Sequence, residues 1–383
     1  MHSRLSPAQY RISLYIVIVI LLHTSCTTLP DSKKDFTYFT QIEIDHIIAS
    51  TSDPILRKIH NNKLSFTNRK LQNIDFSGCQ LVNVDFSNTH LDNINFQYCD
   101  LRKSNFSNAR LNNINFDNAL LEKSRFDSAI INNTHGEKSS FKDASFKGMR
   151  LNKSNFSNSL FNDADLSNTT ITSSKFDNSV FTNALLINSR IEKTDIRFAT
   201  LQEVNATQSQ FIDSIFFRSN FSWANLKHTH WLNCNLQIAK FENVDLSFST
   251  INNCNATAIS LSHSTLDNIS IENSSFREAR MDETNLDSVN LNNMDMELVN
   301  LEWAKLKNSN IYNSNLKKAK LVRSKLSNTT IRNSQLNWAN FVMSKLENVS
   351  LENSDVYKAD FRGADYHPTI LSNTLNQSRT IQK

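Results

Sequence analysis

A large apolar residue returns at every fifth position of the chain, from Phe66 to Leu371. This spacing defines 62 positions, of which only Gly136, Ala206 and Ala256 are not large and apolar. A helix repeats its buried face about every 3.6 residues and a strand every second residue, so neither element explains a spacing of five. The pattern predicts a repeat architecture, in which each unit buries its apolar face only by stacking on its neighbours.

The residues around each central apolar position also follow a pattern. Residues 104–108 (SNFSN), 164–168 (ADLSN) and 359–363 (ADFRG) each combine a small residue, Asn or Asp, a central Leu or Phe, and two further residues that are mostly polar. This unit resembles the repeat of the pentapeptide-repeat family over about four fifths of the chain. The resemblance implies an all-β fold, a right-handed quadrilateral parallel β-helix of about 15 coils, with one pentapeptide per side and 20 residues per coil.

The sequence supports a 20-residue coil independently of the resemblance. Asparagine occupies positions 73, 93, 113 and 133, and recurs every 20 residues from 233 to 373. Stacked side-chain amides can hydrogen-bond along such a column, as in the Asn ladders of cross-β structures. The central residues sort by the same period into an aromatic column (Phe66, Phe86, Phe106, Phe126, Phe146) and an aliphatic one (Leu71, Leu91, Leu111, Ile131).

Only four Gly and four Pro occur in 383 residues, although the coil must turn every five residues. Asn and Asp tolerate turn conformations and bond to nearby backbone, so we expect them to supply the corners. Gly136 removes a large side chain from the wall and adds a flexible residue, which predicts a bulge or a cavity there.

The first 25 residues are predicted to be a signal peptide. Arg4 and Arg11 precede an apolar run, residues 12–22, that is too short to span a bilayer comfortably but suits the core of a signal peptide. Residues 21–26 (LLHTSC) resemble the end of a bacterial lipoprotein signal, in which the cysteine is lipidated and becomes the mature N-terminus. The resemblance implies a lipid-anchored protein attached to the membrane through Cys26.

Two residues beside Cys26 refine this expectation. Thr27 is not the Asp associated with retention at the inner membrane, which favours the outer membrane. His23 stands where the lipoprotein pattern usually has Leu. Simple cleavage with secretion and an uncleaved anchor therefore remain alternatives.

Three further segments complete the predicted organisation. Residues 26–63 lose the five-residue register and are expected to form a tether and an N-terminal cap, with one or two short amphipathic helices. The β-helix is expected over residues 64–371, and a short tail over residues 372–383. An open β-helix end exposes unpaired backbone, so a homodimer formed through one end is the alternative to capping.

Four cysteines remain once Cys26 is assigned to lipid, and they form two pairs 20 residues apart: Cys79 with Cys99 and Cys234 with Cys254. All four lie two places before a central position, on a track that should point inward. One coil of separation falls within the Cα distance range of a disulfide. We expect small buried residues here, and a disulfide within each pair is the alternative.

No combination of residues predicts catalysis or a cofactor. The sequence has no glycine-rich phosphate loop and no nucleophile with partners. His228 and His230 lie near Cys234, but the register directs the cysteine inward and the histidines outward, so no metal site is expected. We therefore expect a protein that is not an enzyme.

Departures from the polar exterior are the candidate binding surfaces. The coil register places Phe198, Ile238, Ala258, Leu298 and Trp338 in one outward column, with Phe217 nearby, and an aligned apolar group can mark a partner site. Scattered surface apolar residues are the alternative. A basic stretch of Lys317, Lys318, Lys320, Arg323 and Lys325 could meet an anionic lipid, polysaccharide or nucleic acid, or be a solvated face.

These features together predict a non-enzymatic, lipid-anchored rod of the bacterial envelope that presents a structural or interaction surface to a protein or glycan. The alternative is a secreted or intracellular effector that binds a protein target, including a DNA-mimic topoisomerase inhibitor. Without residues 1–25 the chain loses Arg4 and Arg11, so its net charge of +4 falls to +2. The acidity that DNA mimicry needs is missing, and no nucleic-acid partner is expected.

Overall fold

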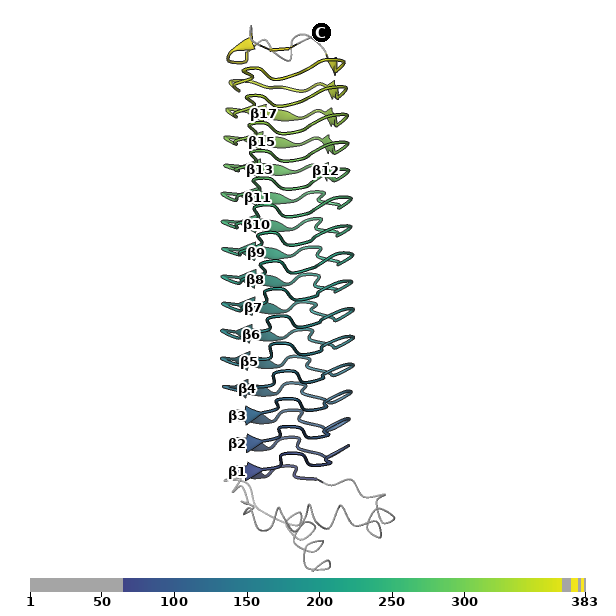
Figure 1. Ribbon diagram of the computed structural model, residues 1–383, viewed down its shortest axis with the longest axis vertical. Helices are drawn as coiled ribbons and strands as arrows, with labels where there is room; N and C mark the ends of the chain where they lie inside the picture. Colours follow the sequence, from purple (N-terminus) through teal and green to yellow (C-terminus); the bar gives the residue numbers. More distant parts are fainter. Residues whose placement is uncertain (1–64, 367–372, 378–379, 382–383) are drawn as a thin grey trace, which may run out of the picture. The chain divides into compact units, whose positions relative to one another are not determined.

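A parallel β-solenoid accounts for the described part of the chain. The computed structural model describes residues 65–366, 373–377 and 380–381, and within these ranges it contains no α-helix. Each coil stacks on the one before it (Figure 1). The parallel β-helix of about 15 coils that the sequence predicted is confirmed. The predicted signal peptide, Cys26, and the tether and cap of residues 26–63 lie outside the described residues.

Two parallel sheets run along the solenoid, and every strand pair joins residues 20 apart. The first sheet has 14 strands: β1 (Lys70–Asp75), β2 (His90–Asn95), β3 (Arg110–Asn115), β4 (Ile130–Asn132), β5 (Arg150–Asn152), β6 (Thr170–Thr172), β7 (Arg190–Glu192), β8 (Gln210–Ile212), β9 (His230–Leu232), β10 (Thr250–Asn252), β11 (Ser270–Glu272), β13 (Asn290–Asn292), β15 (Asn310–Tyr312) and β17 (Thr330–Arg332). The second has five: β12 (Asn285–Asp287), β14 (Lys305–Lys307), β16 (Lys325–Ser327), β18 (Lys345–Glu347) and β19 (Asp365–Tyr366). Isolated bridges such as Gln80 with Asp100 and Asn115 with His135 continue the same register on the other sides.

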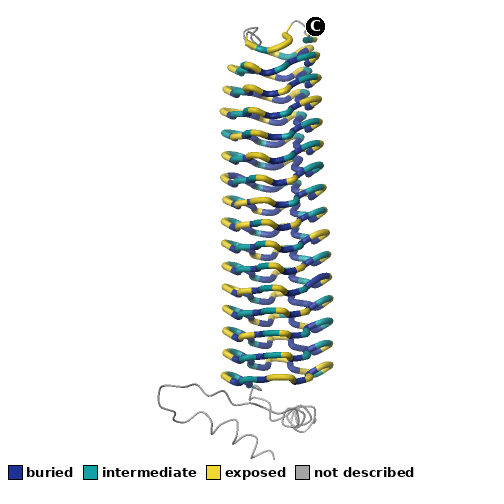
Figure 2. Tube along the Cα trace, turned by 90° about the vertical axis from the view of Figure 1, so that its left-hand side faces the viewer, coloured by how far each residue is buried: buried dark blue, intermediate teal, exposed yellow. Residues whose placement is uncertain are grey.

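The core is a set of side-chain stacks parallel to the axis, and burial follows the repeat around each coil (Figure 2). Phe86 and Phe106 stack with their ring centroids 4.9 Å apart and their planes 7° from parallel. Phe96, from the next aromatic column, meets Phe106 edge-on at 6.1 Å. Stacked and edge-to-face arrangements are the favourable geometries of aromatic pairs. Residues 20 apart therefore pack directly on one another, as the period of the sequence predicts.

Every corner of the coil requires a left-handed backbone. From Asn68 to Gly363, the residue two places after each central position has a positive φ, between 49° and 69°. Only Gly78, Gly148 and Gly363 among these corner residues are glycine. Asn tolerates this conformation better than other non-glycine residues, which explains why it supplies so many corners.

The left-handed corner conformation explains the column of asparagines better than a continuous ladder of side-chain amides does. Asn93 Nδ2 donates to Asn73 Oδ1 at 2.7 Å, as a ladder requires. On the next coil Asn113 Nδ2 donates instead to Asp92 Oδ1 at 3.3 Å. The amide bonds expected from the sequence are thus intermittent, whereas the positive φ is present at every corner.

The C-terminal tail continues the pairing of the solenoid over its described residues. Leu375 forms a bridge with Asp355, and Ile381 forms one with Asp360. Backbone N–H groups of Val356 and Phe361 donate to the carbonyl oxygens of Leu375 (3.1 Å) and Ile381 (2.8 Å). The tail therefore covers part of the last coil's hydrogen-bonding edge, which an open end would leave unpaired.

The chain passes through Gly136 without a bulge, which was one of the two features expected there. The backbone N–H of Gly136 donates to the carbonyl oxygen of Asn155 at 2.8 Å, and His135 keeps its bridge to Asn155. The space above the glycine holds the ring of Phe156, since a Cβ built on Gly136 would lie 2.5 Å from two atoms of that ring. A small cavity of about 10 Å³ remains nearby, lined by Phe156 and other apolar side chains.

Gly136→Ala should destabilise the solenoid by roughly 1 to 3 kcal/mol, because the added methyl group overpacks the core against Phe156. Chemical denaturation of the purified protein would measure the change. Combining Gly136→Ala with Phe156→Leu should recover part of the loss. If Gly136→Ala leaves the protein as stable as the wild type, the position of the Phe156 ring does not depend on the missing side chain.

Candidate interaction surface

Exposed apolar side chains concentrate at corners, where the backbone least favours them. Nine large apolar residues are both exposed and at a corner with positive φ: Tyr98, Phe198, Trp223, Ile238, Phe248, Leu298, Trp303, Trp338 and Met343. Eight of the nine lie at or beyond Phe198. We call these eight residues the apolar corners. For bulky or β-branched residues such a conformation is unusual, so their clustering in one part of the rod requires an explanation.

The residues predicted as a partner surface lie in the expected column, but the column is not continuous. Phe198 contacts Phe217 edge-to-face, with ring centroids 5.7 Å apart. The positions between Phe198 and Trp338 on successive coils include charged residues, namely Arg218, Glu278 and Lys318. The structure thus brings Phe198 and Phe217 together, while Ile238, Leu298 and Trp338 are exposed at separate levels of the rod.

Trp338, one of the predicted surface residues, contacts two neighbouring side chains at its corner. Its side chain is 51% exposed, the Lys358 Nζ lies 4.3 Å from its ring centroid, and the Tyr357 ring meets it edge-on at 6.2 Å. A cation over a tryptophan face is attractive and holds the ring in place. This corner therefore presents an ordered aromatic and cationic group to solvent.

A neighbouring corner column was not predicted from the sequence. Trp223, Trp303 and Met343 lie five residues along the coil from the predicted column, and all three are exposed. The signal was available, since they occupy the same position of the pentapeptide as Phe198 and Trp338. Two adjacent corner columns, rather than one, therefore carry seven of the eight apolar corners.

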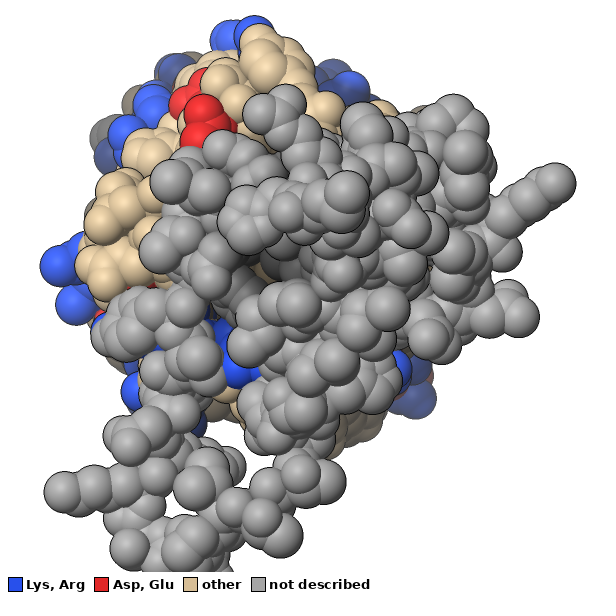
Figure 3. Space-filling model, turned by 90° about the horizontal axis from the view of Figure 1, so that it is seen from below, with Lys and Arg blue, Asp and Glu red and all other residues tan. Residues whose placement is uncertain are grey.

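The predicted basic stretch winds around the coil and does not form one patch. Lys317 and Lys318 lie at one side and its corner, Lys320 and Arg323 at the next, and Lys325 begins β16 on a third. All five side chains are exposed. Seen from the N-terminal end, Lys and Arg side chains likewise project at several places around the rim of the solenoid (Figure 3).

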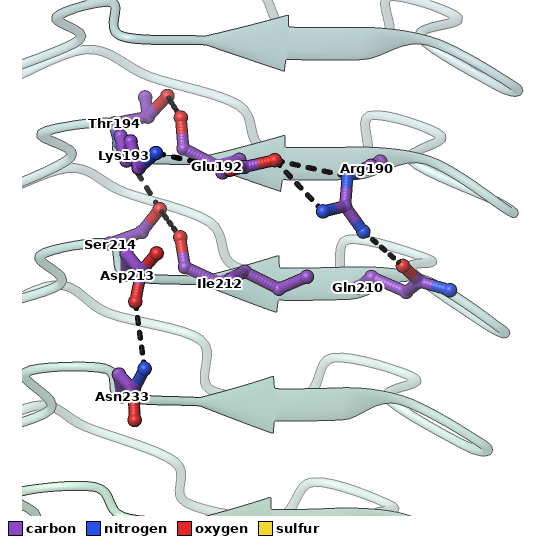
Figure 4. A network of polar contacts seen from close by, with 9 residues as sticks. All are labelled: Arg190, Glu192, Lys193, Thr194, Gln210, Ile212, Asp213, Ser214 and Asn233. Carbon is purple, nitrogen blue, oxygen red and sulfur yellow. Dashed lines mark hydrogen bonds and ion pairs between the residues drawn. The ribbon is translucent and has the colours of Figure 1, made fainter.

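Elsewhere, exterior polar side chains pair with one another both within a coil and between coils. On β7 and β8, Arg190 Nη2 lies 2.8 Å from Glu192 Oε2, and Arg190 Nη1 donates to Gln210 Oε1 at 2.7 Å (Figure 4). On the next coils Asn233 Nδ2 donates to Asp213 Oδ1 at 2.8 Å. Because these polar side chains bond to one another, few of their hydrogen-bonding groups remain for a ligand.

The cysteines take the place of buried serines. Cys99 Sγ donates to the carbonyl oxygen of Phe76 (2.7 Å), just as Ser104 Oγ donates to that of Leu81 (2.8 Å). Burial raises the pKa of the Cys99 thiol to about 12, and a hydrogen bond with Cys254 together with burial raises the pKa of Cys234. The burial of Cys99, Cys234 and Cys254 suits packing rather than nucleophilic chemistry. The two-disulfide alternative stays a prediction.

The histidines near Cys234 point away from it. The ring of His228 stacks on Phe248 at 5.1 Å between centroids, and His230 Nδ1 lies 2.9 Å from Thr250 Oγ1. Cys234 is buried. Across the described ranges, no group of three or more His, Cys, Asp or Glu side chains is placed to hold a metal ion.

The carboxyl groups of Asp177 and Asp195 lie close together on the exterior of the solenoid. Burial, a hydrogen bond with Asp195 and the charge of that residue raise the pKa of Asp177. Arg197 contacts both groups, with Nη2 2.6 Å from Asp195 Oδ2 and Nε 3.5 Å from Asp177 Oδ1. The shared guanidinium makes this an ion-pair cluster on the wall rather than an acid–base dyad facing a substrate.

In the part of the chain that the structure describes, no helix has the length and apolar character needed to cross a membrane.

Comparisons with solved structures found similar solenoids. QnrB1, a plasmid-mediated fluoroquinolone resistance protein, is 19% identical, with a TM-score of 0.30 over 51% of this chain and 89% of that one. HetL, involved in heterocyst differentiation regulation in the cyanobacterium Nostoc sp. strain PCC 7120, is 17% identical, with a TM-score of 0.14 over 85% of this chain and 92% of its own. A pentapeptide repeat protein of the Arabidopsis thaliana thylakoid lumen is 17% identical, with a TM-score of 0.25 over 26% and 68%. The comparison with curated proteins found no match.

Two family models match the chain along most of the solenoid. The model described as a pentapeptide repeat region matches residues 61–126. The model described as pentapeptide repeats (8 copies) matches residues 139–178, 164–201, 219–255, 257–293, 295–333 and 331–365. The two models together cover more than half of the chain, and the matched segments are the coils described above. The chain belongs to the pentapeptide-repeat family.

Proposed function

We propose that this protein is a non-enzymatic interaction rod of the bacterial envelope, which presents the C-terminal half of its solenoid to a protein or glycan partner. The pentapeptide-repeat β-helix is consistent with a structural or interaction role. The observation that carries the proposal is the clustering of the apolar corners from Phe198 onward. Among the corners before Phe198, only Tyr98 is a large exposed apolar residue.

The apolar corners work against the stability of the fold. A left-handed backbone costs an L-residue other than glycine roughly 1–2 kcal/mol, and Asn relieves part of this cost through local hydrogen bonds. A large apolar side chain at such a corner gains no such bond, and exposure to water adds to the disadvantage. A contact outside the chain would compensate both effects, which supports a partner at these corners.

The location of the rod is part of the proposal. The lipoprotein-like residues 21–26 support export and attachment of a lipid at Cys26. The attached protein would lie at the outer membrane, with the solenoid extending from the anchored end. A solenoid of about 15 coils, spaced about 4.8 Å apart, would carry the apolar corners tens of ångströms from that end.

The charge distribution argues against the alternative of a DNA-mimic topoisomerase inhibitor. A mimic of duplex DNA needs a dense array of negative charges along its length. In this chain 41 Lys and Arg residues outnumber 37 Asp and Glu residues. A secreted effector that binds a protein target remains the second candidate, and the apolar corners would serve it equally.

Ile238→Asn should raise the free energy of unfolding by about 1 kcal/mol, because Asn accepts the left-handed corner better than a β-branched residue does. Asn243 has the same φ of 58° and provides the matched control, so Asn243→Ile should lower stability. Urea denaturation measures both changes. A loss of stability in Ile238→Asn would mean that the apolar corner serves the fold and not a partner.

Cys26→Ser should abolish both metabolic fatty-acid labelling and recovery of the protein in the membrane fraction. The thiol of Cys26 is the predicted acceptor of the lipid, and serine cannot replace it as the thioether donor. Labelling of the wild type in its native host, followed by fractionation, provides the measurement. An unlabelled wild-type protein in the cytosol or medium would contradict the envelope proposal and favour the effector.

A further inference from the structure

Positive charge is segregated into one part of the rod. The segment from residue 303 to residue 346 contains nine Lys and Arg residues and no Asp or Glu. The remaining chain holds 32 of the 41 basic residues against all 37 acidic ones, a net charge of −5. We call residues 303–346 the basic belt. Such segregation creates a local positive potential that the modest net charge of the whole chain conceals.

Three lysines of the basic belt stand in strand register on one face. Lys305, Lys325 and Lys345 begin β14, β16 and β18, and each is paired directly with the next in the parallel ladder. All three are exposed, and the ion pairs resolved among the described residues involve none of them. Neighbouring strands lie about 4.8 Å apart, and like charges placed directly opposite one another are destabilising. We call Lys305, Lys325 and Lys345 the lysine ladder. Repulsion between these lysines destabilises the fold, and an anionic ligand would reduce that repulsion.

Different chemistry flanks the two sides of the lysine ladder. On one side are the corners Trp303, Arg323 and Met343, where the Arg323 guanidinium lies 4.9 Å from the Trp303 ring centroid. On the other side are the corners Asn308, Asn328 and Asn348. There Asn328 Nδ2 donates to Asn308 Oδ1 (3.2 Å), and Asn348 Nδ2 donates to Asn328 Oδ1 (3.1 Å). The face therefore combines a file of cations with an aromatic edge and a row of amides.

Acidic residues limit the face at both ends. Asp365 pairs with Lys345 at the C-terminal end of the ladder, and Glu347 shares β18 with Lys345. Asp287 pairs with Lys307 at the other end. The lysine ladder thus spans three coils and not the length of the rod. Three coils correspond to the length of a short segment of a polymer.

We propose that the lysine ladder and its flanking corners bind an acidic polysaccharide, with carboxylates of successive sugars on the lysines, hydroxyl groups on the Asn amides and a sugar ring against Trp303. This inference rests on the proposed function and names the partner class for one part of the rod. A linear uronate polymer carries its anions in single file, as the ladder carries its cations. Charge-assisted hydrogen bonds from lysine to carboxylate are the stronger kind available at such a surface.

Two other polyanions fit the face less well. Phosphates of a DNA strand are spaced about 3.4 Å along the axis of a duplex, which does not match the strand spacing of about 4.8 Å. A membrane-bound surface needs apolar side chains that enter the headgroup region beside the cations. Here the exposed apolar side chains, Trp303 and Met343, lie on one flank only, and the Trp303 ring carries the Arg323 guanidinium. The other flank consists of asparagine amides.

Affinity electrophoresis of the purified full-length protein in nonionic detergent tests the proposal. Polygalacturonate in the gel should retard the wild type, whereas neutral dextran should not, and added salt should weaken the retardation. The triple variant Lys305→Gln, Lys325→Gln, Lys345→Gln should lose affinity about tenfold or more. Its melting temperature should equal or exceed that of the wild type, because the repulsion within the ladder is removed.

A matched control removes three exposed lysines from the opposite end of the rod: Lys103→Gln, Lys123→Gln and Lys142→Gln. It carries the same net charge as the ladder variant and should bind polygalacturonate within about twofold of the wild type. Equal loss in both variants, or no retardation of the wild type, would overturn the proposal. So would binding of oligo-dT or phosphatidylglycerol vesicles without binding of polygalacturonate. The assay uses purified protein, so failure here leaves lipid attachment at Cys26 standing, and failed labelling of Cys26 leaves this site standing.

Discussion

The hydrogen bonds between residues 20 apart are the constraint on which the rest of the structure depends. They fix each coil above the last, so that a phenylalanine packs on a phenylalanine and a lysine stands over a lysine. The same register buries the central side chains and forces a left-handed corner every five residues. The same geometry thus produces favourable stacking of side chains in the core, and repulsion and left-handed corners on the surface. The surface that we propose for a partner consists of interruptions of the repeating surface pattern.

Much of the fold could be predicted from the sequence, because a linear repeat turns sequence spacing directly into spatial position. The aromatic column headed by Phe66 and the inward track of Cys99 follow from counting alone. The packing at Gly136 could not be predicted, since filling of that space depends on the rotamer of Phe156 on the next coil. The intermittent amide bonds of Asn113 likewise depend on a choice between two nearby acceptors. The candidate surface was recovered in part: Trp303 and Met343 were missed because only one corner column was considered.

The corners connect stability with function. The fold favours Asn or Gly at the corners, and most corners before Phe198 carry one of these two residues. From Phe198 onward, apolar and aromatic residues replace Asn at eight corners, and from Trp303 onward the charge becomes uniformly positive for two coils. Both changes burden the isolated chain, one through backbone conformation and the other through repulsion. Their coincidence around Trp303 and Trp338 supports our proposal that the C-terminal part of the rod meets a partner.

Site-specific photo-crosslinking in the native host tests this account most directly. A diazirine amino acid would replace Trp338, and a second variant would carry it at Asn178, an exposed corner of the same column with φ of 58°. Our account predicts a light-dependent adduct of the protein at position 338 and none at position 178. Equal adducts at both positions, or none at either, would contradict a partner surface confined to the C-terminal half of the solenoid.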